Sequence, residues 1–163
     1  MFELLVIFFL NSLYGVEVSS CERQNNLFSV SFNNSFKIAN IGYDGSIRLP
    51  YDVYGKKKFM DIFIYSRDAY SRIESALKNC SFDISKTFEK PDYKIFDIKK
   101  LKSQKRIANA VISFDDDINI VFGVVKKNNY YIIYPPDNFE FIDDEFKKQL
   151  YYYISNYFYS EER

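Results

Sequence analysis

The stretch Ser-Val-Ser-Phe-Asn-Asn-Ser-Phe-Lys-Ile at 29–38 returns in altered form as Val-Ile-Ser-Phe-Asp-Asp-Asp-Ile-Asn-Ile at 111–120. Each copy predicts a strand, a tight turn and a return strand, because Asn and Asp tolerate the positive φ of short hairpin turns. A second apolar run that ends in proline follows each copy, Ser-Ile-Arg-Leu-Pro at 46–50 and Ile-Ile-Tyr-Pro at 132–135. A repeat of this size predicts two similar modules packed together.

Alternating apolar residues extend the strand pattern on both sides of these turns. The predicted strands are 16–19, 27–32, 36–41, 47–49, 59–65, 93–101, 108–114, 118–125 and 130–134. Polar residues predict a turn at 22–26 and a loop at 51–58. Helices are predicted over 66–79 and 143–158, where apolar residues recur at helical spacing behind capping residues.

Short turns pair these strands antiparallel, and one helix covers each sheet. The expected fold class is therefore α+β, with two tandem β-rich units, each of antiparallel hairpins plus one helix, packed as a pseudo-dimer. The expected boundaries are a signal peptide at 1–15, a first unit at 16–80, a linker at 81–92 and a second unit at 93–160.

The composition excludes several classes of function. Lys and Arg number 22 and so do Asp and Glu, so any binding of nucleic acid would need a local basic patch. Histidine is absent, which excludes a Ser-His-Asp triad, a Cys-His pair and imidazole metal ligands. Two cysteines are too few for a thiolate zinc site within one chain, and no glycine-rich phosphate loop occurs. We therefore expect a protein that is not an enzyme and holds no cofactor and no metal.

The N-terminus carries an apolar run, Leu-Leu-Val-Ile-Phe-Phe-Leu at 4–10, followed by small and polar residues up to Gly15. This pattern predicts a secretory signal that is cleaved after Gly15, and thus a location in the periplasm, the cell envelope or the extracellular space. The run is too short to span a bilayer, so no transmembrane helix is expected in the mature chain. The alternative is a buried N-terminal strand of a cytoplasmic protein, because Glu3 precedes the run and no Lys or Arg does.

The chemical state of the two cysteines depends on where the protein is located. In an oxidising compartment Cys21 and Cys80 would form a disulfide, worth roughly 4 kcal/mol in the chain-entropy model for a loop of this length. The stretch Val-Ser-Ser-Cys at 18–21 also resembles a lipobox, in which Cys21 would carry a lipid. In a cytoplasmic protein both residues would be small buried hydrophobes.

Several stretches resemble one known family. They are Ile-Phe-Asp-Ile-Lys-Lys-Leu at 95–101, the run from Arg106 to Val125, Phe-Ser-Val-Ser-Phe at 28–32 and Ser-Arg-Asp-Ala-Tyr-Ser-Arg-Ile-Glu-Ser-Ala-Leu at 66–77. They are similar to the stage V sporulation protein G family of septation regulators, present here as two tandem, diverged copies. The resemblance implies small α+β units that dimerise through their sheets, have no enzymatic activity and bind DNA or RNA. The chain departs from the family in its predicted export signal.

Two basic stretches are candidate binding sites for nucleic acid or for a protein partner. The first is Lys56, Lys57 and Lys58, flanked by aromatic residues that could stack on bases while the lysines hold phosphates. The second consists of Lys99, Lys100, Lys102, Lys105 and Arg106. For both, the alternative is a solvated charged loop or strand end.

Two further clusters have competing interpretations. Asp115-Asp116-Asp117, with the acidic start of the last helix, could bind a hard cation, but the matching Asn33-Asn34-Ser35 favours a plain turn. The last helix is crowded with Tyr151, Tyr152, Tyr153, Tyr157, Phe158 and Tyr159. One interpretation is that these aromatics form a surface that binds a second copy of the chain or an unknown protein partner. The other is that they pack on the first helix.

The sequence thus leaves two main hypotheses. The first is an exported interaction module without catalytic activity, built as a fused pseudo-dimer. The second is a cytoplasmic regulator of the sporulation or septation type, with both basic stretches on the phosphates of DNA or RNA.

Overall fold

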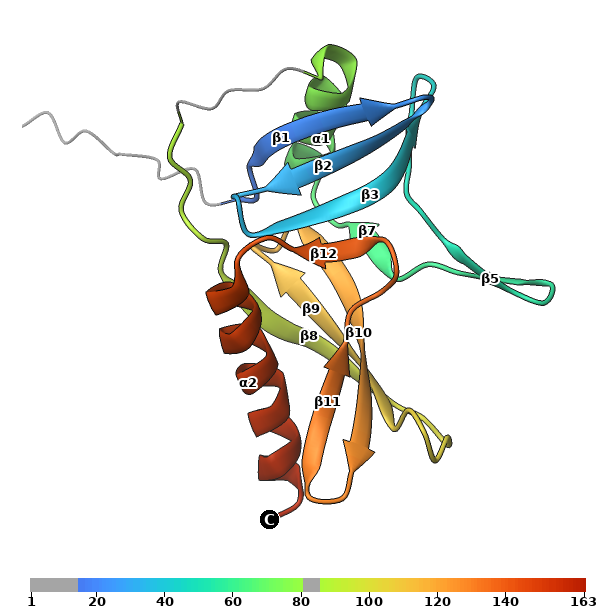
Figure 1. The fold of residues 1–163 in the computed structure, drawn as a ribbon, viewed down its shortest axis with the longest axis vertical. Helices are drawn as coiled ribbons and strands as arrows, with labels where there is room; N and C mark the ends of the chain where they lie inside the picture. The colour runs from blue at the N-terminus through green and yellow to red at the C-terminus, as the bar shows by residue number, and fades with distance from the viewer. Residues whose placement is uncertain (1–14, 81–85) are drawn as a thin grey trace, which may run out of the picture.

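The computed structural model describes residues 15–80 and 86–163, shown as a ribbon in Figure 1. Nearly all of the predicted signal peptide and the first part of the predicted linker lie outside these residues. The first half contains β1 Val18–Gln24, β2 Leu27–Phe32, β3 Phe36–Tyr43, β4 Ile47–Arg48, β5 Asp52–Tyr54, β6 Lys57–Phe59, β7 Ile62–Ile64 and α1 Arg67–Asn79. The second half contains β8 Tyr93–Lys100, β9 Ala108–Phe114, β10 Ile118–Lys127, β11 Tyr130–Tyr134, β12 Phe139–Phe141 and α2 Asp144–Glu161.

The predicted α+β class is confirmed, with two antiparallel sheets and a helix after each set of strands. The repeated turns fold alike. Asn33 and Asn34 have φ of 48° and 51°, and Asp115 and Asp116 have φ of 50° and 58°. Both hairpins therefore use the left-handed turn that Asn and Asp tolerate best, which fixes the register of the strands on either side.

The two halves exchange one strand each. The first sheet has the order β1-β2-β3-β12, and β4 also pairs with β3. The second has the order β11-β10-β9-β8, and β7 also pairs with β10. Strand β12 of the second half thus completes the first sheet, and β7 of the first half completes the second, as Figure 1 shows for β12 beside β3.

Matching hydrogen bonds hold the two exchanged strands. The amide of Val121 donates to the carbonyl of Asp61 at 2.8 Å, and the amide of Ala39 donates to the carbonyl of Asn138 at 2.9 Å. The two sheets are therefore related by a pseudo-two-fold arrangement, and neither is complete without a segment from the other half of the chain.

Aromatic side chains fill the junction between the sheets. The ring of Phe36 on β3 lies 4.8 Å from that of Phe114 on β9 and 5.3 Å from that of Phe139 on β12. Phe122 on β10 lies 5.5 Å from Phe139. Since all four side chains are buried, the two sheets share one hydrophobic core.

Both predicted helices are present with their predicted caps. The hydroxyl of Ser66 accepts a hydrogen bond from the amide of Ala69 at 3.0 Å at the start of α1. The carboxylate of Asp143 accepts from the amide of Phe146 at 2.9 Å at the start of α2. The hydrogen bond from Lys90 and that from the helix amide lower the pKa of Asp143, so it caps α2 as an anion.

Three details differ from the sequence prediction. The predicted turn at 22–26 begins too early, because β1 runs to Gln24 and the chain turns at Asn25, which has φ of 57°. The predicted loop at 51–58 is a strand hairpin, described below. Strand β12 was not predicted, because its three residues gain their place from pairing with β3 and not from a local pattern.

Phe139 provides a test of the shared core, since it is 6% exposed and contacts aromatic rings of both sheets. We expect Phe139→Ala to lower the free energy of unfolding by about 3–5 kcal/mol, with both halves still unfolding in one transition. Urea titration followed by tyrosine fluorescence and by far-UV circular dichroism measures this. The matched control is Tyr152→Ala on the exposed side of α2, for which we expect a change below about 1 kcal/mol. Two separate transitions, or a loss as small as that of the control, would contradict a shared core.

Candidate functional site

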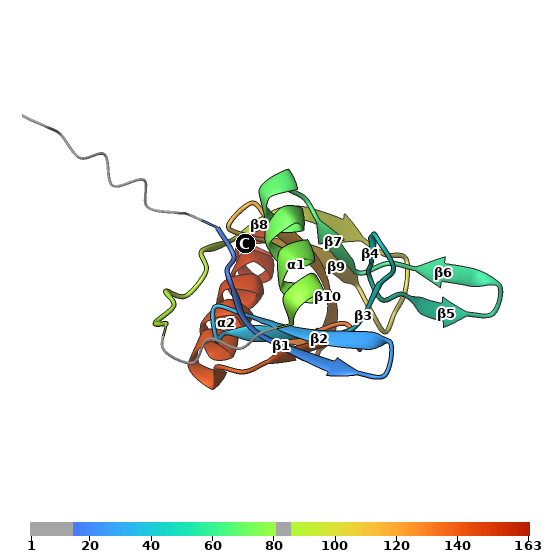
Figure 2. The same ribbon diagram turned by 90° about the horizontal axis from the view of Figure 1, so that it is seen from above.

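A hairpin of β5 and β6 projects from the body of the molecule, as the view from above in Figure 2 shows. Asp52 pairs with Phe59 and Tyr54 pairs with Lys57, and Gly55 turns the chain with φ of 64°. The second half has no counterpart, because only residues 135–138 connect β11 to β12 there. The hairpin is therefore an addition to the repeated architecture.

The hairpin and its flanks carry large apolar side chains in solvent. Those that are exposed are Tyr51, Val53, Tyr54, Phe59 and Met60, with Tyr54 at 68%. An isolated two-stranded hairpin is at best marginally stable in water, and exposed apolar groups in close succession typically mark a contact surface. These side chains therefore form the strongest candidate for an interaction surface outside the core.

The three predicted lysines lie on this hairpin. Lys56 is in the turn, and Lys57 and Lys58 are on β6. The ammonium group of Lys58 lies 4.5 Å from the ring centre of Tyr51, a cation–π contact. All three are exposed, and the ion pairs found within 15–80 and 86–163 involve none of them.

The second basic stretch is divided by the fold. Lys99 and Arg106 line a hollow of about 420 Å³ at the base of the hairpin. Lys100 faces away from it, with its ammonium nitrogen 3.7 Å from a carboxylate oxygen of Glu161 on α2. Lys102 and Lys105 are exposed in the loop between β8 and β9 and do not line the hollow.

The hollow is formed by segments from both halves. Its walls are Asp52, Tyr54, Phe59, Asp61, Lys99, Leu101, Arg106, Asn109, Pro135, Pro136 and Asp137. The structure therefore places Lys99 and Arg106 at the base of the hairpin that carries the first predicted basic stretch, whose lysines Lys56–Lys58 do not line the hollow. We call the hairpin and this hollow together the hairpin surface.

Arg106 is the most distinctive group of the hollow. Its side chain lies against Gly123, where an added Cβ would be 2.8 Å from the Nε and Cζ atoms of the arginine. The Nε atom of Arg106 and the Oδ1 atom of Asn109 are both buried, and neither has a hydrogen-bond partner among the residues that the structure describes. A buried polar group without a partner costs about 1–3 kcal/mol, so Nε of Arg106 is free to donate to a ligand and Oδ1 of Asn109 is free to accept from one.

The first sheet offers an internal comparison. Gly42 pairs with Leu27 in the first sheet, and Gly123 pairs with Asn109 at the equivalent place in the second. The side chain of Arg48 lies against Gly42, as that of Arg106 lies against Gly123. Arg48 has a carboxylate partner, with Nη1 2.7 Å from an oxygen of Asp44. Arg106 takes part in no ion pair within the described residues, so the two halves differ at this point.

Three acids share the hollow with these cations. Burial raises the pKa of Asp61, and the neighbouring carboxylates Asp52 and Asp137 raise it further, while Arg106 lowers it. The hollow thus presents both signs of charge within a small space. A phosphate group that approaches Arg106 would also meet carboxylates, which disfavours a polyanion and favours a partner with mixed charge.

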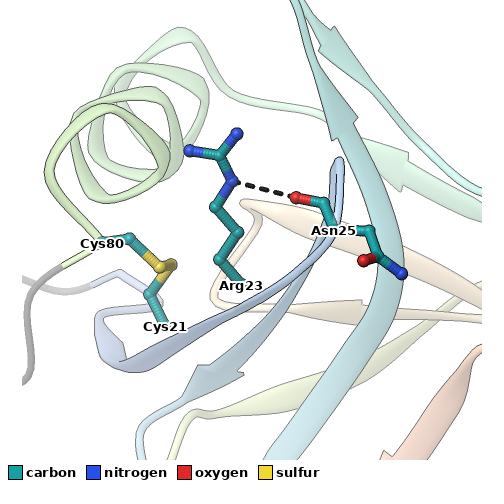
Figure 3. The surroundings of a disulfide bond; sticks show 4 residues. All are labelled: Cys21, Arg23, Asn25 and Cys80. Atoms are coloured by element: carbon teal, nitrogen blue, oxygen red, sulfur yellow. Dashed lines mark hydrogen bonds between the residues drawn. A yellow bond between two sulfur atoms is a disulfide. The ribbon is translucent and has the colours of Figure 1, made fainter.

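The predicted disulfide is present. Cys21 on β1 is bonded to Cys80 at the end of α1, with their Cα atoms 5.1 Å apart (Figure 3). Cys80 has φ of 35°, a left-handed conformation that ends the helix. Beside the bridge, Nε of Arg23 donates to the carbonyl of Asn25 at 3.1 Å. The bridge engages both thiols, so the alternative of a lipid on Cys21 does not fit this structure.

The acidic turn and the tyrosines have structural roles. Asp115 and Asp116 form the tight turn, and the described residues contain no group of three or more His, Cys, Asp or Glu side chains placed to hold a metal ion. On α2, Tyr152 is 70% exposed, and the ring of Tyr153 lies 5.4 Å from that of Tyr93. Part of the aromatic cluster thus packs on the second sheet, and part faces solvent.

Comparison of the chain with protein-family models, with curated proteins and with solved structures finds no match. None of the helices among the described residues is long and apolar enough to cross a membrane. The site must therefore be interpreted from its own geometry. The sequence did not predict the acids of the hollow, because the exchange of strands brings Asp61 beside Asp137 from far away in the chain. The one available signal was that the segment after the proline is longer in the first copy than in the second.

Asp115 gives a pH-dependent prediction. Burial raises its pKa to about 6, although the hydrogen bond from the amide of Asp92 lowers it. A folded pKa above the unfolded value means that this group destabilises the protein as pH rises from about 4 through 6. Asp115→Asn keeps a hydrogen-bond acceptor at this position and introduces the residue found at the matching position, Asn33. We expect the variant to be more stable than the wild type at pH 7 by about 1 kcal/mol, after allowance for solvent screening.

The measurement is urea unfolding of both proteins at pH 4 and at pH 7. The advantage of Asp115→Asn should vanish at pH 4, where the aspartate of the wild type is protonated. The control is Asp116→Asn at the next turn position, where the carboxylate is exposed and paired with Lys94, so we expect this substitution not to stabilise the protein at pH 7. An equal difference between Asp115→Asn and wild type at both pH values would show that burial of this carboxylate is not responsible.

Proposed function

We propose that this chain is an exported binding module without catalytic activity, which holds a protein partner through the hairpin surface. The observation that carries the proposal is the projecting hairpin, with its exposed apolar residues above a hollow of mixed charge. Protein interfaces are enriched in Tyr, Phe, Met and Arg, and all four are found here. Arg106 and Tyr54 are the expected anchors, since Arg and Tyr are frequent hot spots of binding.

Export is supported by two independent features. The apolar run near the N-terminus has the form of a secretory signal, and the Cys21–Cys80 bridge needs an oxidising compartment to persist. The mass of the chain recovered from fractionated cells tests this directly. An exported product would begin at Val16 and gain two hydrogens on reduction, whereas an uncleaved product with two free thiols would exclude export.

The second candidate function is a cytoplasmic regulator that binds DNA or RNA, and the three lysines of the hairpin beside Tyr51 and Tyr54 favour it. The proposed relation to the stage V sporulation protein G family would agree with either candidate, because a pseudo-two-fold pair of sheets fits a fused dimer of such units. The three carboxylates of the hollow are the reason to place this candidate second.

Photo-crosslinking tests the first candidate. A photoreactive residue replaces Tyr54 on the hairpin, and in a matched control it replaces Tyr152, which is equally exposed on α2. In the producing cells we expect a crosslinked protein of defined mass from position 54 and none from position 152. Arg106→Ala should reduce this product at least about tenfold, as expected for loss of an interface hot spot. Equal crosslinking from both positions would contradict a specific hairpin surface.

Binding to nucleic acid is tested on the same protein. A labelled single-stranded 30-mer is titrated with wild type and with a Lys56→Ala, Lys57→Ala, Lys58→Ala variant between about 50 and 200 mM salt. We expect no specific binding at the higher salt concentration and little difference between the proteins. Tight, steeply salt-dependent binding that the triple variant loses would instead support the regulator.

A further inference from the structure

The backbone of Val16 lies in a buried polar cluster at the start of the described chain. The side chain and backbone together are 1% exposed. The amide nitrogen of Val16 donates to Oδ2 of Asp117 at 2.9 Å, and its carbonyl accepts from Nε of Arg72 at 3.0 Å. Both backbone groups of Val16 are therefore bonded to charged side chains that come from other parts of the fold.

Asp117 joins three parts of the molecule. It is 6% exposed, and its Oδ2 atom also accepts from Nη2 of Arg72 at 2.5 Å. The hydroxyl of Ser66, which caps α1, donates to its other oxygen. The carboxylate thus connects the turn between β9 and β10 to α1 and to the chain before β1.

Gly15 passes very close to the same cluster. A Cβ added at residue 15 would lie 2.7 Å from Nη2 of Arg72 and 2.7 Å from Oδ2 of Asp117. A side chain at this position would therefore displace the ion pair. The small residue is also the type found on the leader side of a secretory cleavage site.

The surrounding charges are predominantly negative. Burial raises the pKa of Asp115 most, and the charges of Asp92 and Asp117 raise it further, while the hydrogen bond from the amide of Asp92 and the charge of Arg72 lower it. Glu17, the next residue along, is paired with Lys86. Of these carboxylates only Asp117 is paired with Arg72, and a further positive charge beside them would be stabilised.

The pseudo-two-fold relation provides an internal comparison for Val16. The amide of Asn33 donates to the carbonyl of Glu17, and the amide of Asp115 donates to that of Asp92. Glu17 therefore corresponds to Asp92, and Val16 corresponds to Pro91, which is also buried but has no amide proton.

Asp117 also has a different residue as its counterpart in the pseudo-two-fold arrangement. Asp117 is the last residue of the turn between β9 and β10, and Ser35 is the last residue of the matching turn between β2 and β3. The neutral hydroxyl of Ser35 donates to the carbonyl of Asn33 within its own turn. Near Pro91, where the chain continues from one half to the other, the ion pair is instead that of Lys90 with Asp143, the cap of α2. A carboxylate and an arginine occur where the mature chain would begin.

We propose that the α-ammonium group of Val16, released by cleavage after Gly15, forms a buried ion pair with Asp117 that anchors the mature N-terminus. This rests on the export part of the proposed function. Hydrolysis adds water to the Gly15–Val16 peptide bond, leaves a carboxylate on Gly15, and gives Val16 an amine that takes up a proton at neutral pH. The neutral amide donor becomes a charged one, so the contact with the Asp117 carboxylate gains a direct attraction between opposite charges.

The consequence is a link between processing and stability. The leader leaves before the chain folds, so burial of Val16 does not hinder cleavage. Once the chain is folded, the anchored N-terminus holds the start of β1, whose Cys21 is bonded to Cys80. Cleavage at any other peptide bond would place the charge away from Asp117.

The test compares two purified chains with the disulfide formed, one beginning at Val16 and one at Gly15, each released from a fusion partner by a protease that leaves no extra residue. Acylation of the α-amino group at pH 7 is followed by mass spectrometry of the N-terminal peptide. We expect the Val16 chain to react about tenfold more slowly, since an ion pair that raises the amine pKa by one unit removes nine-tenths of the reactive free amine. It should also have the higher melting temperature.

Asp117→Asn in both chains is the control, and it should remove both differences. If this variant does not fold, the comparison of the two wild-type chains still decides the matter. Equal acylation rates and equal melting temperatures would overturn the ion pair while leaving export and the hairpin surface unaffected, because neither purified chain depends on export. A cell-derived product that begins at a residue other than Val16 would overturn the cleavage step itself.

Discussion

The structure depends on the reciprocal exchange of β7 and β12. Each is a strand of three residues that completes the sheet of the opposite half. Strands so short gain little stability from their own sequence, and their place is set by backbone pairing and by rings such as Phe139 in the shared core. Neither half can bury its apolar surface alone, so the chain behaves as a fused dimer that must fold as one body.

The same exchange creates the candidate site. It places Asp61, next to β7, beside Asp137, which precedes β12, and both lie under the projecting hairpin of β5 and β6. The hairpin breaks the pseudo-symmetry, and it carries Tyr54, the most exposed aromatic side chain of the described first half. The N-terminal cluster around Asp117 breaks the symmetry a second time. In both places the two copies have diverged in charge, as expected if the repeated fold is a scaffold and the differences carry the specific roles.

The sequence predicted what local chemistry determines. The Asn-Asn and Asp-Asp turns and the caps at Ser66 and Asp143 were predictable, because turn and cap preferences act over a few residues. The Cys21–Cys80 pair was predictable for another reason, because the chain has only two cysteines. Strand β12 and the acidic lining of the hollow were not, because they are defined by partners far away in the chain. The basic stretch from Lys99 to Arg106 was recognised, but its division into a hollow-facing part and a solvent-facing part depends on the path of the loop after β8.

Native-state hydrogen exchange tests the central claim, that the two halves form one cooperative body, most directly. The probes are the amides of Ala39 and Val121, each of which donates to a carbonyl beside an exchanged strand. The account predicts that, as urea is added, both amides exchange only through global unfolding. Their free energy of exchange and its dependence on urea should then equal those of core amides in both sheets. Exchange of one sheet through an opening that leaves the other sheet protected would contradict it.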